Sequence, residues 1–154
     1  MERRRVAFAV AAAVVVGFDQ LTKQLALSGL DDGPVDLVGS LQLRLTFNDG
    51  AAFSFGAGRT TWIALVASAV AIGIAVLGLR ATRVALATGY GVIFGGAVGN
   101  LLDRAVRDGT GFLGGRVVDF VDPGWWPVFN LADAALWVGI GILVIATVRE
   151  PEPG

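Results

Sequence analysis

Residues 130–148 read NLADAALWVGIGILVIATV, an apolar stretch whose one ionisable side chain, Asp133, lies close to its beginning. A helix needs roughly 20 mostly apolar residues to cross the hydrocarbon core of a bilayer. Three earlier stretches, about residues 6–30, 61–79 and 85–102, also meet this requirement. The sequence therefore predicts a membrane protein with four transmembrane helices.

The composition supports this interpretation. The 154-residue chain is 55% hydrophobic and only 16% charged, and its mean hydropathy of +0.69 is far above that of soluble domains. The length predicts a single domain covering residues 1–154. The formal net charge of −1 gives no reason to expect nucleic acid as a partner.

The chain contains no histidine and no cysteine. Their absence excludes Ser-His-Asp and Cys-His nucleophilic sites, thiol redox chemistry, and zinc sites that need imidazole or thiolate ligands. Carboxylates, the single lysine Lys23 and hydroxyl groups are left to carry any reaction. We expect no metal and no cofactor.

The N-terminus also imitates a cleaved signal peptide. Arginines at 3–5 precede an apolar run, and small residues follow at 26–28. However, Asp19 and Lys23 lie between the apolar run and the small residues, which leaves an overlong polar region for a signal peptide. We therefore favour a retained first helix.

The basic residues predict the orientation of the four helices. Cytoplasmic segments of membrane proteins carry an excess of lysine and arginine. The N-terminus, the 80–84 turn and the C-terminal tail are short and hold half of the twelve basic residues, whereas the long loops 31–60 and 103–129 are sparsely basic. The sequence therefore predicts that both termini are cytoplasmic and that the two long loops are outside.

The first long loop carries a β pattern between about residues 35 and 58. Residues 41–47, LQLRLTF, alternate strictly between apolar and polar side chains, which is the period of a half-buried strand. Residues 116–121 are a second candidate strand that could pair with it. The expected fold is thus an all-α membrane protein of four transmembrane helices with a small extracytoplasmic β-sheet.

Glycines recur every four residues in the third span, at Gly91, Gly95 and Gly99. Such spacing lets a second helix backbone approach closely. We expect these glycines to serve helix packing rather than to contact a substrate.

Polar residues converge at one membrane boundary in this topology. The first and third spans run outward, and the fourth runs inward. The polar residues of the outer helix ends and of the loop before the fourth span then lie near the outer face: Asp19, Lys23, Asn100, Asp103, Arg104, Asp119, Asn130 and Asp133. Ionisable groups inside a membrane are costly and are functional by default.

Most of these residues also have a structural interpretation, as Asp103 and Arg104 could form an ion pair at the membrane interface. Asp19 and Lys23 are four residues apart on one helical face and could neutralise each other. Asn130 suits a helix N-cap, with Asp133 favoured at the third helical position by the helix dipole. Asp119 stands among apolar neighbours, where a lone carboxylate needs a partner or a proton.

Five short stretches resemble the bacterial signal peptidase II (prolipoprotein signal peptidase) family, and they occur in the family's order over nearly the whole chain. They are 19–23 (DQLTK), 48–53 (NDGAAF), 99–104 (GNLLDR), 118–120 (VDF) and 129–133 (FNLAD). The resemblance implies that Asp119 and Asp133 are the catalytic aspartates. It implies supporting or substrate-binding roles for Asp19, Lys23, Asn48, Gly50, Asn100, Asp103, Arg104 and Asn130. Residues 105–116 depart from the pattern and are interpreted as an insertion rich in glycine and charge.

The resemblance also implies an activity. The chain would be an aspartyl endopeptidase of the bacterial cytoplasmic membrane that cuts a prolipoprotein before its diacylglyceryl-modified cysteine. Its active site would lie near the outer face, its partners would be this substrate and membrane lipid, and it would act as a monomer. Two close carboxylates cannot easily both be charged, so the pair is expected to share a proton. Asp133, near a helix N-terminus, is then the expected base.

Two other functions fit parts of the sequence. A small transporter or channel would place ionisable residues such as Asp19, Lys23 and Asp133 along a path through the membrane. A Ser-Lys peptidase would use Lys23 with Ser28 or another hydroxyl. The first predicts charges near the membrane midplane, and the second predicts that the aspartates are dispensable.

Overall fold

The computed structural model describes residues 1–50, 59–109 and 111–149. Residues 51–58, which include part of the expected β-rich loop and of the NDGAAF motif, lie outside the described residues. The chain forms four helices and three strands in the order α1 (Glu2–Gly29), β1 (Val35–Val38), β2 (Leu41–Asn48), α2 (Arg59–Arg80), α3 (Val84–Val106), β3 (Val117–Asp122) and α4 (Leu131–Val148).

All four helices are long and apolar enough to cross a membrane, which confirms the four predicted spans. The shortest, α4, has 18 residues and is therefore about 27 Å long at 1.5 Å per residue. Large apolar side chains are exposed along the helices, as at Phe18, Val66 and Ile145. Such exposure is expected for a surface that faces lipid rather than water.

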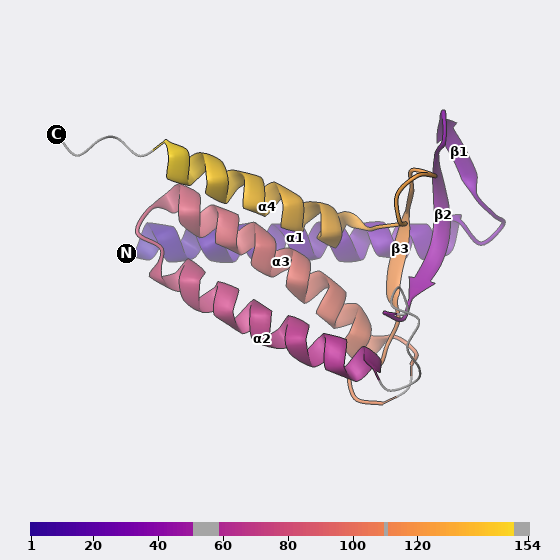
Figure 1. The fold of residues 1–154 in the computed structure, drawn as a ribbon, viewed down its shortest axis with the longest axis horizontal. Helices are drawn as coiled ribbons and strands as arrows, with labels where there is room; N and C mark the ends of the chain where they lie inside the picture. Colours follow the sequence, from indigo (N-terminus) through magenta and orange to yellow (C-terminus); the bar gives the residue numbers. More distant parts are fainter. Residues whose placement is uncertain (51–58, 110, 150–154) are drawn as a thin grey trace.

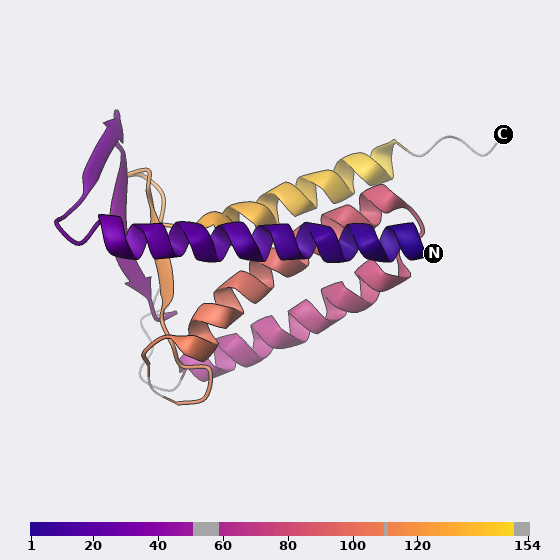
Figure 2. The same cartoon turned by 180° about the vertical axis from the view of Figure 1, so that it is seen from behind.

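Helix α3 lies between α2 and α4. Helix α1 crosses α3, behind it in Figure 1 and in front of it in Figure 2. Glycines make this close approach possible. A Cβ atom at Gly91 would collide with the Phe8 carbonyl of α1, and one at Gly95 would come within 2.8 Å of the Ala12 carbonyl. The packing role predicted for these two glycines is thus confirmed.

The strands form one antiparallel sheet in the order β1-β2-β3. The predicted pairing between the alternating stretch and the strand around Asp119 is confirmed, with Thr46 opposite Asp119 and Asn48 opposite Val117. Strand β1 was not foreseen as a separate strand. The sheet stands across one end of the helical bundle, here called the sheet end (Figure 1).

The other end of the bundle, here called the terminal end, carries the beginning of α1, the end of α4 and the short α2–α3 turn (Figures 1 and 2). Arg4 joins these parts, because its guanidinium donates to the Ala81 and Thr82 carbonyls at 3.1 and 2.8 Å. The beginning of α1 and the end of α4 therefore lie on one side of the spans and the sheet on the other.

Residues 105 and 106 belong to α3, and the described residues that follow them in the 105–116 stretch fold back on the end of this helix. Gly109 and Gly115 form an isolated β-bridge, and the Gly115 N–H donates to the Arg104 carbonyl at 3.0 Å. The Phe112 carbonyl accepts a 3.0 Å hydrogen bond from the Thr61 hydroxyl of α2. Contacts with two helices therefore hold this connection in place.

Candidate active site

Asn130 and Asp133 form a capping box at the beginning of α4. The Asn130 Oδ1 atom accepts the Asp133 N–H at 3.0 Å, and the Asp133 Oδ2 atom accepts the Asn130 N–H at 3.2 Å. Two N–H groups that lack partners within the helix are satisfied in this way. The capping predicted for Asn130 is confirmed, and it fixes the Asp133 carboxylate at the positive end of the helix dipole.

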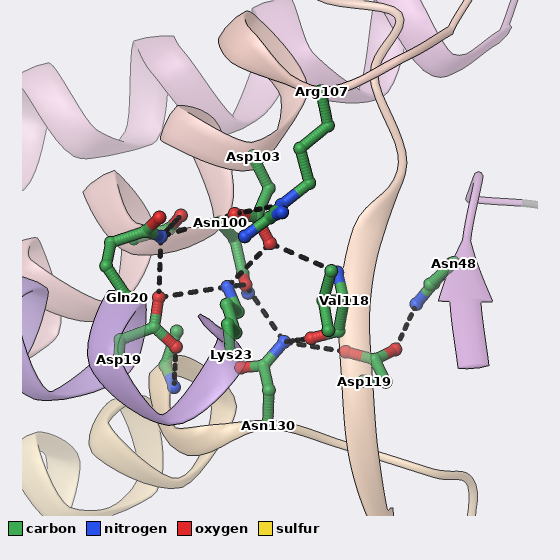
Figure 3. Close-up of polar contacts among 12 residues, drawn as sticks. Asp19, Gln20, Lys23, Asn48, Asn100, Asp103, Arg107, Val118, Asp119 and Asn130 are labelled. Atoms are coloured by element: carbon green, nitrogen blue, oxygen red, sulfur yellow. Dashed lines mark hydrogen bonds and ion pairs between the residues drawn. The ribbon is translucent and has the colours of Figure 1, made fainter. Parts of the chain in front are cut away.

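The amide nitrogen of Asn130 reaches the second predicted catalytic residue, Asp119. It donates to Asp119 Oδ1 at 2.6 Å, while Asn48 Nδ2 donates to Asp119 Oδ2 at 3.0 Å (Figure 3). Asp119 lies on β3 and is only 2% exposed. One asparagine side chain therefore contacts Asp119 with its nitrogen and caps Asp133 with its oxygen.

Strand register brings Asn48 to Asp119. Thr46 is opposite Asp119, and Asn48, two residues further along β2, presents its side chain on the same face. The Asn48 Oδ1 atom accepts the Gly50 N–H at 2.8 Å. Gly50 has a φ of +83°, a left-handed conformation that favours glycine. Gly50 thus shapes the turn that orients Asn48.

The environment of Asp119 raises its pKa to about 6, mainly because burial disfavours the charged form. The negative charge of Asp133 raises the pKa further, whereas the hydrogen bonds from Asn48 and Asn130 lower it. The two carboxylates are thus close enough to influence each other's charge. A carboxyl group with a pKa near 6 exchanges its proton close to neutral pH, as general acid–base chemistry requires.

Asn100 connects Asp133 to the first helix. Its Nδ2 atom donates to Asp133 Oδ1 at 2.9 Å, and its Oδ1 atom accepts from Lys23 Nζ at 2.9 Å and from Asn130 Nδ2 at 3.0 Å. Lysine only donates and an ionised carboxylate only accepts. The orientation of the Asn100 amide is therefore fixed by its neighbours.

Lys23 lies at the centre of a buried charge cluster made of Asp19, Lys23, Asp103 and Arg107 (Figure 3). Its Nζ atom is 2.9 Å from Asp19 Oδ2 and 3.0 Å from Asp103 Oδ2. Together with Asn100, these two carboxylates supply one acceptor for each of its three protons. The pairing predicted for Asp19 and Lys23 is confirmed, and Asp103 is a second acidic partner.

The charge cluster also holds the backbone on which the two site aspartates lie. Asp19 Oδ1 accepts the Ala132 N–H at the beginning of α4, and Asp103 Oδ2 accepts the Val118 N–H of β3, both at 3.0 Å. Ala132 precedes Asp133, and Val118 precedes Asp119. Each carboxylate of the cluster therefore fixes the backbone next to one site aspartate.

Two members of this network were missed in the sequence. Gln20 donates to Asp19, to the Gly99 carbonyl and to Asp103 at 3.1–3.2 Å, and Arg107 Nε forms a 2.8 Å ion pair with Asp103 Oδ1. The four-residue spacing of Asp103 and Arg107 could have predicted their ion pair, because residues four apart are neighbours on a helix. Gly99 also has a role beyond helix packing, since a Cβ atom there would lie 2.5 Å from Asp19 Oδ2.

Arg104 extends from the last turn of α3 and is 9% exposed. Its charge interacts with Asp119, Asp133, Asp103 and Asp49. Among the described residues, its Nη1 atom is buried and has no hydrogen-bond partner. Arg104 thus offers an unused donor beside the two site aspartates.

The arrangement of carboxylates and amides is suited to acid–base chemistry. Within the described ranges, no three acidic side chains converge as a metal ion would need. The structure brings together all ten residues singled out in the sequence: Gly50 acts through Asn48, and the others contact the network directly or electrostatically. Two carboxylates joined through neutral amides, with one pKa raised, can accept and donate a proton in turn.

The sequence profile of signal peptidase (SPase) II matches residues 11–149. The lipoprotein signal peptidase of Rhodococcus jostii is 45% identical over 98% of this chain and 77% of its own length. That of Mycobacterium avium is 44% identical over 89% of this chain and 76% of its own length.

A solved bacterial membrane enzyme structure, determined by the in meso method at 1.9 Å resolution, superposes with a TM-score of 0.78. It is 25% identical, and the alignment covers 94% of each chain. The described residues of the five motifs that suggested the family lie around one site in the structure, and the matches extend over most of the chain. The chain belongs to the signal peptidase II family.

Proposed function

We propose that this protein is an aspartyl endopeptidase that removes the signal peptide from lipid-modified bacterial prolipoproteins, cutting before the diacylglyceryl cysteine. The observation that carries the proposal is the pair formed by Asp119 and Asp133, which are joined through Asn130. Relatives that align over most of the chain are named lipoprotein signal peptidases, and such an enzyme acts on a prolipoprotein.

The pair performs the hydrolysis by sharing one proton. Asp133, at the N-terminus of α4, is the ionised base and takes a proton from water as its oxygen attacks the scissile carbonyl carbon. Asp119, whose pKa is raised to about 6, carries the proton and donates it toward the carbonyl oxygen. When the tetrahedral intermediate collapses, the C–N bond breaks, the leaving amine takes the proton that Asp133 gained, and a hydroxyl of the intermediate returns its proton to Asp119 as the carbonyl forms again.

The amide side chains and Arg104 support these steps. Asn48, Asn100 and Asn130 hold the two carboxylates through neutral hydrogen bonds, which leave the shared proton free to move. The Nη1 atom of Arg104, which has no hydrogen-bond partner among the described residues, can donate to a carbonyl oxygen of the substrate and so place the peptide next to Asp119.

The position of the site suits a substrate held in the bilayer. The network lies at the sheet end of the spans, where a signal helix and the acyl chains of a modified cysteine would meet the membrane boundary. The arginine-rich terminal end supports a cytoplasmic location for both termini and an outer location for the site. The described residues of a single chain suffice to form the network, which supports the proposal that the protein acts as a monomer.

The two rival functions find less support. A channel or transporter needs polar groups along its path, whereas the network residues of α1, α3 and α4 gather at the sheet end. A Ser-Lys peptidase needs its lysine beside the nucleophilic hydroxyl, but the Lys23 Nζ atom is directed instead at two carboxylates and the Asn100 oxygen. The hydroxyl of Ser28 donates to the Gln24 and Leu25 carbonyls of its own helix.

Cleavage of a purified precursor tests the proposal. The protein in detergent or bilayer should cut a diacylglyceryl-modified precursor and release a product whose first residue is the modified cysteine. A precursor that lacks the lipid should be cut far more slowly. Rapid cleavage of the unmodified precursor, or cleavage at another bond, would contradict the proposed substrate.

A further inference from the structure

A pocket of about 600 Å³ lies at the sheet end, apart from the site aspartates. It is lined by Leu27 near the end of α1, by Val106 and Arg107 at the end of α3, by Phe47 on β2, and by Asp108 and Arg116 of the 105–116 connection. Side chains alternate along a strand, so Phe47 points to the opposite face of the sheet from Asn48. The pocket is therefore separate from the Asp119–Asp133 site.

The lining is divided between apolar and charged side chains. Leu27, Phe47 and Val106 form the apolar part, and Phe47 and Val106 are 47% and 72% exposed. The guanidinium groups of Arg107 and Arg116 supply the charged part. The Arg116 side chain has no hydrogen bond or ion pair with another described residue, and Arg107 uses only Nε in its contact with Asp103.

This combination identifies a class of ligand. Guanidinium groups bind phosphate oxygens through paired, charge-assisted hydrogen bonds. The ends of α1 and α3 place the pocket at the membrane boundary, where a phospholipid presents its phosphate above its acyl chains. The carboxylate of Asp108 can accept hydrogen bonds from hydroxyl groups on the same headgroup. We propose that this pocket binds the headgroup of one anionic phospholipid, with its phosphate on Arg107 and Arg116 and its glycerol backbone against Leu27, Phe47 and Val106.

The proposal gives the 105–116 connection a function. The Gly109–Gly115 bridge returns the chain to the end of α3, so Arg116 is held beside Arg107 although the two are nine residues apart. Side chains would prevent this return, because a Cβ atom at Gly115 would lie 2.6–2.9 Å from the carbonyls of Asp103, Arg107 and Arg104. The connection is thus built to bring a second arginine to the pocket.

Native mass spectrometry of the full-length protein tests the proposal, with phosphatidylglycerol as the anionic probe and phosphatidylcholine as the neutral probe. The wild-type protein should retain one phosphatidylglycerol with an affinity about tenfold above that for phosphatidylcholine. Arg116→Gln should reduce this preference to about twofold or less, since it removes a charged pair of donors. Arg116 is exposed and its side chain has no contact that the fold depends on, so this variant should remain folded.

The matched control is Arg149→Gln, which removes one positive charge from the terminal end of the bundle. It should leave the lipid preference unchanged. An equal loss in both variants would mean that overall charge, not the pocket, selects the lipid, and would overturn the proposal. Unchanged preference in Arg116→Gln would also overturn it. So would displacement of the lipid by millimolar inorganic phosphate, because the pocket would then recognise free phosphate.

Discussion

Two groups of carboxylates lie side by side at the sheet end, and they differ in what neutralises them. Asp19 and Asp103 are ion-paired with Lys23 and Arg107. Asp119 and Asp133 receive hydrogen bonds from the neutral amides of Asn48, Asn100 and Asn130. The carboxylates of the first group are fixed by ion pairs and in turn fix the backbone beside the site, whereas Asp119 in the second group has a pKa raised to about 6 and can gain or lose a proton near neutral pH. The comparison separates residues that position the site from residues that react.

The largest expected effect on stability comes from removing the central cation. Lys23→Met leaves Asp19 and Asp103 buried with only Arg107 for compensation, and it should lower the free energy of unfolding by about 3–5 kcal/mol. Reversible unfolding in detergent, monitored by circular dichroism, would measure the change. Adding Asp19→Asn to this variant removes one uncompensated charge and should recover part of the loss. No recovery would mean that charge balance does not explain the role of Lys23.

A smaller effect on stability, which depends on pH, is expected from Asp119, whose carboxylate receives hydrogen bonds from the Asn48 and Asn130 amides. The pKa of Asp119 is raised from its ordinary value of 3.8 to about 6, so the folded protein binds the proton more tightly than the unfolded chain. The resulting stabilisation is complete below pH 3.8 and is lost as the pH rises through 6. Between pH 4 and pH 7, stability of the wild type should fall relative to Asp119→Asn by on the order of 2 kcal/mol. Parallel stability curves for the two proteins would contradict the raised pKa.

Asp122, which lies on the same strand as Asp119, provides a matched comparison. Hydrogen bonds from the Gly124 N–H and from Arg44 lower the pKa of Asp122 below its ordinary value. Asp122 therefore stabilises the folded state above its unfolded pKa, and this contribution is lost as the pH falls toward its folded pKa. Asp122→Asn should leave the pH 4–7 difference attributed to Asp119 in place.

The smallest effect is expected at Asn130, which links the two aspartates. Asn130→Ala removes the helix cap and should cost about 1 kcal/mol of stability, together with roughly a tenfold loss of turnover, equivalent to ~1.4 kcal/mol. Asn130→Ser keeps a capping oxygen, but it lacks the amide nitrogen that reaches Asp119 while the oxygen caps the helix. It should therefore regain stability without regaining turnover. If the serine variant regains both, Asn130 acts only as a cap.

Much of this arrangement could be predicted from the sequence, because membrane spans and helix caps are local. Hydropathy located the four helices, and the pattern around Asn130 predicted its capping role. The four-residue spacing also predicted the pairing of Asp19 with Lys23. The helix directions then placed the polar residues at one end of the bundle.

The remaining features depend on side chains that meet only in the folded protein. Asp103 could equally have paired with Arg104, its neighbour, but the structure pairs it with Lys23 and Arg107. Asn130 contacts both Asp119 and Asp133 because β3 lies beside the beginning of α4. No local sequence pattern specifies this placement. The return of the 105–116 connection to α3 depends likewise on the Gly109–Gly115 bridge.

The most direct test compares one carboxylate from each group under identical conditions. Asp119→Asn and Asp103→Asn both keep the side-chain shape and remove one negative charge. For each variant, cleavage of a lipid-modified precursor and the free energy of unfolding would be measured on the same preparation. Asp119→Asn should lower turnover at least about 100-fold, the usual cost of losing a general acid or base, with stability retained. Asp103→Asn should lose stability, with turnover of the folded protein within about tenfold of wild type. Near-wild-type cleavage by folded Asp119→Asn would contradict the aspartyl mechanism.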